Sequence, residues 1–387
     1  MAEIKKLTAE HYDELLALLN YTFGNKNGKE VDFLTEQPKM WVRDDTHMGC
    51  HLGTFEDGKL CAVVGVYPLQ TVIDGEKFLF ATTGNVATLP EYEGRGYFTA
   101  LFTEAMKELE KMGADAARLG GARQRYGRFG YEGCGTSYLF TFDAKNRTRG
   151  FSETAGKEIV FSPIAHEDTE ALAFCRSLRV RLPIYVERPM DGGGIEVYRS
   201  MCSKNKKPYL ATRDGAPVGY ICCGADGKDI GEFDALDTAT KGEMICAWQA
   251  KVPERIISFS VPVFDREALR MFCATAESYR LTYPSRFKML CWDRVAGAMM
   301  RYHARENRLL DGEWVFEIRG YGKLCLFVRE GVGGCEKTKK DASLSFDCLT
   351  AARLLFGPTR PEDIADLPPI PRSWLPLPFS WGLLDAI

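Results

Sequence analysis

The sequence lacks several features that would each define a class of protein. No run of apolar residues is long enough to span a bilayer, and the first six residues do not have the apolar core of a secretion signal. These two absences predict a cytoplasmic protein. The formal net charge of −3 gives no basic excess, which argues against a nucleic-acid partner. At 387 residues the chain is long enough for two or three domains.

Histidine is scarce, and cysteine follows no recognisable pattern. The 13 cysteines are an odd number at irregular spacings without a Cys-x-x-Cys pair, so we expect free thiols rather than zinc ligands or a disulfide framework. The five histidines offer little choice of catalytic base. His47, Cys50 and His51 lie close together, but His51 begins a predicted strand and no further ligand follows at a useful spacing. We therefore expect no metal site.

The sequence does contain a strand that runs into a glycine-rich turn and then a helix. Residues 78–88 are rich in β-branched and aromatic residues, and Gly94-Arg95-Gly96 follows. From Tyr97 to Met112 the apolar residues fall at helical spacing. The first N–H groups of such a helix have no partner within it, so the turn is suited to holding a phosphate. An ordinary strand–turn–helix connection is the alternative.

A second segment follows about thirty residues later and reads Arg125-Tyr126-Gly127-Arg128-Phe129-Gly130-Tyr131. It presents Tyr126 one helix and one strand after the glycine turn, close to whatever hangs from a phosphate held there. Together the two segments indicate transfer of a group carried by a pyrophosphate-bearing cofactor. The alternative for Tyr126 is a packed aromatic side chain with its hydroxyl satisfied nearby, as we expect for Tyr131.

The two segments resemble the GNAT N-acetyltransferases and, more narrowly, the Eis-type (enhanced intracellular survival) acetyltransferases. The motifs that carry this resemblance are Pro-x-Tyr-x-Gly-Arg-Gly before a helix, and Tyr-Gly-Arg-Phe-Gly-Tyr. The resemblance implies acetyl-CoA as co-substrate, with its pyrophosphate on the backbone amides of Gly94, Arg95, Gly96, Tyr97 and Phe98. It also implies that the pantetheine arm pairs with a strand edge, opened by a bulge, at Val86, Ala87 and Thr88.

Glu93 departs from the family pattern, which usually has Arg or Gln at this position. A carboxylate beside a pyrophosphate is repulsive. Either Glu93 turns away or pairs with Arg95, leaving the backbone amides to bind, or the affinity for CoA is weakened. We favour the first alternative, because backbone donors dominate in such sites.

The resemblance covers nearly the whole chain and implies an α/β (α+β) fold in three parts. Residues 1–145 would form a GNAT domain, and the polar stretch 145–156 would be a linker. Residues 146–290 would form a second, degenerate GNAT-like domain without a Gly-Arg-Gly turn. Residues 291–387 would form a sterol-carrier-protein-like α/β domain, which we expect to cap the protein without binding lipid.

The expected mechanism is direct attack of an amine on the thioester, with both substrates bound together. Tyr126 is the predicted general acid, because a tyrosine stays protonated at neutral pH. The resemblance places the C-terminal carboxylate of Ile387 near the amine as base or orienter, with Asp385 as a second candidate carboxylate. The proline-rich stretch 367–371 would lead the tail there in extended form. Simple docking of an apolar tail is the alternative.

The resemblance implies a cationic acceptor, which could be an aminoglycoside, a polyamine or a lysine. Such an acceptor needs an acidic pocket. Aromatic and acidic residues near the N-terminus could line it: Tyr12, Tyr21, Phe23, Glu30, Asp32, Phe33, Glu36 and Trp41. Helix packing explains most of them equally well. The family also suggests a hexamer built as a trimer of dimers. A lipid- or acyl-binding protein, or an acyl-CoA sensor without transferase activity, is the alternative function.

Overall fold

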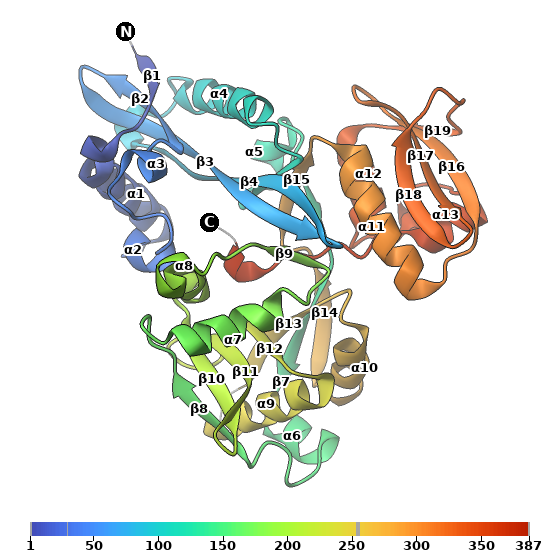
Figure 1. Ribbon diagram of the computed structural model, residues 1–387. Coiled ribbons are helices and arrows are strands. Elements are labelled where there is room, and N and C mark those ends of the chain that lie inside the picture. The colour runs from blue at the N-terminus through green and yellow to red at the C-terminus, as the bar shows by residue number, and fades with distance from the viewer. Residues whose placement is uncertain (1, 29, 253–255, 386–387) are drawn as a thin grey trace.

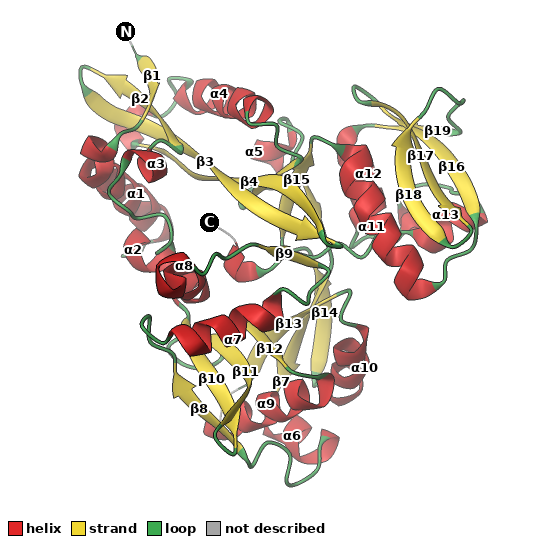
Figure 2. Cartoon of the chain, in the orientation of Figure 1, coloured by secondary structure: helices red, strands yellow, loops and turns green. Residues whose placement is uncertain are grey.

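The computed structural model of the chain describes residues 2–28, 30–252 and 256–385. It has a mixed α/β architecture with three sheets, each accompanied by helices (Figures 1 and 2). Among these residues no helix is both long and apolar enough to cross a membrane. The three sheets appear as three units in Figure 1, and the C-terminal segment returns from the third unit to the space between the other two.

The first sheet has eight strands, in the order β1-β2-β3-β4-β5-β15-β6, with β9 paired to β3. Helix α4 covers one face through apolar side chains spaced along one stripe, and α1 covers the other face. The elements of this unit are β1 (Glu3–Lys6), α1 (Tyr12–Asn27), α2 (Phe33–Glu36), α3 (Asp45–Met48), β2 (His51–Glu56), β3 (Lys59–Ile73), β4 (Glu76–Thr88), α4 (Tyr97–Lys111), β5 (Ala116–Leu119), α5 (Arg123–Gly127), β6 (Glu132–Cys134), β9 (Ile184–Val186) and β15 (Ser285–Met289).

The second sheet has seven strands, in the order β14-β7-β13-β12-β11-β10-β8. Its elements are β7 (Ser137–Phe142), α6 (Ala144–Gly150), β8 (Ile159–Pro163), α7 (Thr169–Arg179), α8 (Asp191–Cys202), β10 (Lys207–Arg213), β11 (Ala216–Cys223), β12 (Asp229–Ala235), α9 (Thr238–Lys251), β13 (Ile257–Pro262), α10 (Arg266–Thr275) and β14 (Ser278–Thr282). Helix α6 occupies the first half of the stretch predicted to be a linker. The carboxylate of Asp143 caps it and Asn146 completes a capping box, which stabilises this short polar helix.

Both sheets have the same succession of pairings. Four antiparallel strands lead to one parallel pair, β4 with β5 in the first sheet and β12 with β13 in the second. Two further antiparallel strands complete each sheet. At these strands the chain passes from one sheet to the other. Strand β7 was expected in the first unit but pairs in the second sheet, and β15 was expected in the second unit but pairs in the first. The boundaries at 145 and 290 therefore assign one strand of the second sheet, β7, to the first unit, and two strands of the first sheet, β9 and β15, to the second.

The third sheet has four strands, in the order β18-β17-β16-β19. Its elements are α11 (Trp292–Asn307), β16 (Gly312–Ile318), β17 (Gly322–Arg329), β18 (Val332–Lys337), β19 (Leu344–Phe346), α12 (Cys348–Phe356) and α13 (Pro369–Trp374). Helix α13 corrects the expectation of an extended proline-rich approach. Its prolines fall in the first turn, where the missing N–H would have had no helical partner.

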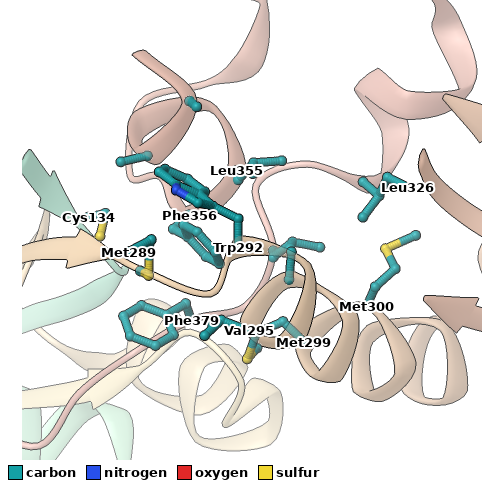
Figure 3. Close-up of a cluster of buried hydrophobic side chains, with 14 of the residues drawn as sticks. Cys134, Met289, Trp292, Val295, Met299, Met300, Leu326, Leu355, Phe356 and Phe379 are labelled. Atoms are coloured by element: carbon teal, nitrogen blue, oxygen red, sulfur yellow. The ribbon is translucent and has the colours of Figure 1, made fainter. Parts of the chain in front are cut away.

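One apolar cluster joins the third unit to the first sheet. Figure 3 shows Trp292 and Phe356 beside Met289 and Phe379, so helices α11 and α12, strand β15 and the C-terminal segment share this core. The rings of Phe356 and Phe379 lie 5.5 Å apart. Burial of such large side chains contributes roughly 1.5–3 kcal/mol each. The C-terminal segment that begins at Leu377, called the tail below, is therefore buried as far as Trp381, where it runs from the third unit to the first sheet.

Candidate active site

A pocket of about 380 Å³ lies where β4 leads into α4. It brings together most of the residues predicted to hold a cofactor: Val86, Ala87, Thr88, Glu93, Gly94, Gly96, Tyr97 and Phe98. Tyr92 and Arg125 complete its lining. The sequence had assigned no role to these two, although Arg125 directly precedes Tyr126 and Tyr92 lies within the first motif.

The turn before α4 needs glycine for its backbone conformation. Gly94 and Gly96 have φ of 78° and 83°, in the left-handed region. A Cβ at either position would meet no atom within 4 Å, so the backbone and not crowding excludes other residues. Gly96 is the N-cap of α4, and it has no side chain that could cap the helix. The first N–H groups of α4 are therefore left to the pocket, where an anion is also favoured by the helix dipole.

Strand β4 carries the expected bulge. The register between β3 and β4 shifts between Val63 and Gly65, and Asn85 has φ of 51°. On its other side β4 pairs with β5 only as far as Thr83 and Leu119. The strands then separate, which leaves the edge from Val86 to Thr88 facing the pocket. This edge is suited to pair with an extended, amide-containing ligand.

The charges around the pocket differ from the expected arrangement. Glu93 is exposed at the pocket, and Arg95 forms an ion pair at 3.0 Å with Glu56 of β2. Arg95 is absent from the lining, and its guanidinium lies 4.8 Å from the ring of Tyr92. Arg125 places a positive charge at the pocket, 5.5 Å from the ring of Phe98. The basic side chain at the pocket therefore comes from the second motif and not from the first.

Tyr126 lies on the short helix α5 and is only 6% exposed. Its ring contacts those of Phe98 and Phe102 on α4, with centroids 6.0 and 5.3 Å away. A Cβ on Gly121 would come within 2.8 Å of the Tyr126 ring, so glycine is needed for this packing. Burial raises the pKa of Tyr126, and Arg125 partly offsets this effect. Tyr126 is not itself among the lining residues, but its ring lies against Phe98, which is.

The other tyrosine of the motif is packed in the core. Tyr131 is fully buried, and its hydroxyl lies 2.8 Å from that of Thr83. Burial raises its pKa far above the ordinary value. Tyr131 therefore matches the structural role expected for it.

The histidine and cysteine cluster near residue 50 has structural partners. His51 is buried between the backbone carbonyl of Met48, which accepts from Nδ1 at 3.2 Å, and the hydroxyl of Tyr67, which lies 2.7 Å from Nε2. Burial lowers the pKa of His51 to about 4, so it stays neutral. Asn85 of the bulge donates to the same Tyr67 hydroxyl at 2.6 Å. Among the described residues no group of three or more potential ligands could hold a metal ion.

The tail is anchored next to the first sheet. Trp381 stacks on Phe80 of β4 with ring centroids 5.3 Å apart, and Leu384 accepts a hydrogen bond from Lys39 at 3.1 Å. Asp385 pairs with two guanidinium groups, those of Arg179 and Arg188. These buried contacts occupy the Asp385 carboxylate, so it is not available as the second candidate base. Ile387, the first candidate, lies outside the described residues.

The aromatic and acidic residues near the N-terminus do not form one acidic lining. Phe33 and Trp41 are buried in the core. Asp32 caps α2 by accepting from the backbone of Leu34. Glu36 faces Lys204, with 3.8 Å between the charged groups. Packing, capping and an ion pair therefore occupy Phe33, Trp41, Asp32 and Glu36.

A second cavity of about 360 Å³ lies in the opening between β12 and β13. These two strands pair only at Asp229–Ser258 and Ile230–Phe259 before they separate. Tail residues Ser380–Leu383 form part of the cavity wall. The second sheet thus has an opening like that of the first, but the chain's own C-terminal segment lies against it.

Comparison with known proteins shows which folds and domains this chain resembles. The family model described as acetyltransferase (GNAT) domain matches residues 3–134. A GCN5-related N-acetyltransferase from Kribbella flavida is similar over 100% of both chains, with 17% identity and a TM-score of 0.66. A probable N-acyltransferase from Enterococcus faecalis (17% identity, TM-score 0.69) covers 99% of this chain and 98% of its own. Eis1 from Mycobacterium abscessus has 17% identity and a TM-score of 0.64 over 100% of both chains. No curated protein sequence matches.

Proposed function

We propose that this GNAT acetyltransferase moves the acetyl group of acetyl-CoA to an amine while both substrates are bound. The observation that carries the proposal is the pocket at the start of α4. It combines a free helix N-terminus for the pyrophosphate with the strand edge Val86–Thr88 for the pantetheine arm. The buried phenol of Tyr126 packs against Phe98, which lines the same pocket.

The proposed reaction is one direct displacement. The amine nitrogen attacks the thioester carbonyl, the new C–N bond forms, and the C–S bond breaks. Tyr126 donates its phenolic proton to the departing thiolate, and the raised pKa keeps that proton in place until the sulfur takes it. The amine loses its proton to a base. We assign the base or orienter to the C-terminal carboxylate of Ile387, on the grounds of the family resemblance.

The finer parts of the proposal also come from the resemblance. We propose an Eis-type enzyme with a sterol-carrier-protein-like third unit, assembled as a hexamer, whose acceptor is an aminoglycoside, a polyamine or a lysine. The buried path of the tail supports a role for the chain end, because Leu377–Trp381 is held inside the protein by the cluster around Phe356 and by Phe80.

Release of free thiol from acetyl-CoA in the presence of amines tests the proposal. Untagged protein should release CoA and yield an acetylated amine by mass spectrometry. Binding of acetyl-CoA without release for any amine would instead favour an acyl-CoA sensor. The role of Ile387 is tested by moving one affinity tag between the two ends. A C-terminal tag should impair transfer while the same tag at the N-terminus does not, and equal rates would remove this carboxylate from the mechanism.

A further inference from the structure

Arg118 is a buried cation with donors that lack partners. It lies on β5, where it pairs in register with Thr82 of β4 and Phe287 of β15, and it is 6% exposed. Among the described residues its Nε and Nη1 find no hydrogen-bond partner, and neither does the neighbouring Thr82 hydroxyl. Buried guanidinium groups are ordinarily paired, because an unpaired charge in the interior is costly. An unpaired one indicates a position for an anion.

The position of Arg118 is close to the proposed reaction centre. The last pair between β4 and β5 is Thr83 with Leu119, one residue beyond Arg118, and there the strands separate toward the acetyl-CoA pocket. Ala117 and Leu119 pack in the core beneath α4. Because side chains alternate along a strand, Arg118 faces the opposite side of the sheet, the side on which Trp381 stacks against Phe80. Arg118 therefore lies on the face that the C-terminal segment covers, beside the point where β4 and β5 separate.

The surroundings of Arg118 carry more positive than negative charge. Charge interactions link Arg118 with Asp385, Lys39 and Lys204. Asp385 is shared with Arg179 and Arg188, which also pair with Glu232, and Lys204 faces Glu36. Within this set the cations are Lys39, Arg118, Arg179, Arg188 and Lys204, and the carboxylates are Glu36, Glu232 and Asp385. Among the described side chains the set thus has two more cationic than anionic groups, and the C-terminal carboxylate of the proposed mechanism would offset one of them.

Arg118 keeps its positive charge at neutral pH despite its burial. Burial lowers the pKa of Arg118 to about 10, and Asp385 raises it in part, so the guanidinium is charged at neutral pH. Burial also lowers the pKa of Lys39 to about 7, with Asp385 acting in the opposite direction. A polycationic acceptor would add charge of the same sign to this side of the sheet. An acceptor with an anionic group would supply the missing partner.

We propose that Arg118 binds a carboxylate of the acceptor, so that the preferred substrate is an amino-acid-type amine such as lysine and not a polyamine. The inference rests on the proposed acetyl transfer and narrows its acceptor. A guanidinium offers several N–H donors in one plane, which matches the two oxygens of a carboxylate. Arg118 thereby selects and positions the acceptor, and takes no part in proton transfer.

Two pairs of amines that differ only by a carboxylate test this assignment. Lysine against cadaverine, and ornithine against putrescine, keep the side-chain amine and remove the acid group. Wild-type protein should show a kcat/KM for lysine about 10- to 100-fold above that for cadaverine, the range expected for hydrogen bonds to a charged group. Arg118→Gln should remove this preference by lowering the value for lysine while that for cadaverine changes little.

Arg286→Gln is the matched control, since Arg286 lies on the neighbouring strand β15, next to Phe287 and therefore on the other face of the sheet. It should leave the preference for lysine unchanged. Equal use of the paired amines by wild-type protein, or a preference for the polyamines, would overturn the proposal. An Arg118→Gln loss that is equal for both amines would also overturn it, and would assign Arg118 to the chain's own C-terminal carboxylate.

Binding separates this inference from the proposed function. Calorimetry of the CoA-loaded protein should show tighter binding of lysine than of cadaverine, with the difference lost in Arg118→Gln. Acetylation of no amine at all would contradict the proposed function, whereas the binding comparison would still decide the assignment of Arg118. Equal or absent binding of the two amines would overturn that assignment.

Discussion

The two large sheets share a topology but differ at the turn into the following helix. In the first sheet, β4 leads to Gly96, which caps α4 without a side chain. In the second, β12 leads to Asp237, whose carboxylate accepts from the backbone of Thr240 at 2.8 Å and caps α9. This hydrogen bond lowers the pKa of Asp237. The N-terminus of α9 is thus capped by a carboxylate of the chain itself, whereas the N-terminus of α4 is left to an anion from a bound ligand.

The segments that follow β5 and β13 also differ, and again only the first sheet's segment lies at a pocket beside a helix N-terminus without a side-chain cap. Strand β5 is followed by α5, which presents Tyr126 beside the pocket. Strand β13 is followed by α10, which is capped by Asp265. The tail residues Ser380–Leu383 lie against the second opening, whereas the first opening forms the pocket at α4. Topology alone therefore does not make a pocket with a free helix N-terminus, because the residues at the two turns decide which sheet has one.

The largest effect is expected from Tyr126, which has no counterpart in the second sheet. Tyr126→Phe should lower kcat by about 1,000-fold, because a phenylalanine cannot protonate the thiolate. The affinity for acetyl-CoA should stay almost unchanged, since the ring packing against Phe98 and Phe102 is retained. Steady-state kinetics and calorimetry measure the two quantities. A variant with full turnover would show that Tyr126 is only a packing residue.

A large loss of stability is expected where the second sheet anchors the tail. Glu232 of β12 pairs with Arg179 and Arg188, which also hold Asp385. Glu232→Gln leaves the two guanidinium groups short of a carboxylate and should lower the free energy of unfolding by about 3 kcal/mol. Glu196→Gln, which removes a partly exposed partner of Arg199 on α8, is the control and should change it by less than about 0.5 kcal/mol. Denaturant unfolding at pH 7 distinguishes them.

The same carboxylate predicts a dependence of stability on pH. Burial raises the pKa of Glu232, but Arg179 and Arg188 more than offset this and lower it to about 2. Because the folded pKa is below the unfolded value, this contribution is fully present above about pH 4.5 and is lost as the pH falls toward 2. The difference in unfolding free energy between wild type and Glu232→Gln should therefore shrink across that range. A constant difference would contradict a charged Glu232.

The comparison of the two turns can be tested by moving the second cap into the first sheet. Gly96→Asp places a carboxylate where Asp237 stands in the second sheet, and should weaken acetyl-CoA binding by about 100-fold through repulsion and self-capping. Gly96→Asn has nearly the same shape without the charge, and asparagine tolerates a positive φ. Calorimetry should therefore find the asparagine variant much closer to wild type. Equal losses would mean that backbone strain, and not the anion, is responsible.

The smallest effect is expected from Glu93. Its exposed carboxylate lies at the pocket, where Arg125 supplies the opposite charge. Glu93→Gln should tighten acetyl-CoA binding by only about threefold, because solvent screens exposed charges. The gain should fall further at high salt. A gain of more than about 30-fold would show that Glu93, and not the backbone, sets the affinity.

The pocket and the fold class could be predicted because their signals are local. The glycines at 94 and 96 and the motif around Tyr126 have a spacing that a single strand–turn–helix unit explains. The exchange of β7 and β15 could not be predicted, because a strand pattern does not say which sheet the strand joins. Helix α6 was missed because its polar sequence suggested a loop, although the Asp143 capping box is typical of a helix start. Helix α13 was missed because its prolines suggested an extended segment, although prolines in a first turn also fit a helix start. Arg118 gave no signal at all, since only the tertiary fold buries it.

The most direct test of the account is calorimetric titration of untagged wild-type protein with acetyl-CoA. We predict saturable binding at micromolar affinity to one site per chain, since the turn at Gly94–Phe98 provides backbone donors despite Glu93. Absence of binding up to millimolar acetyl-CoA would contradict the assignment of this pocket. It would also remove the functional difference between the two sheets.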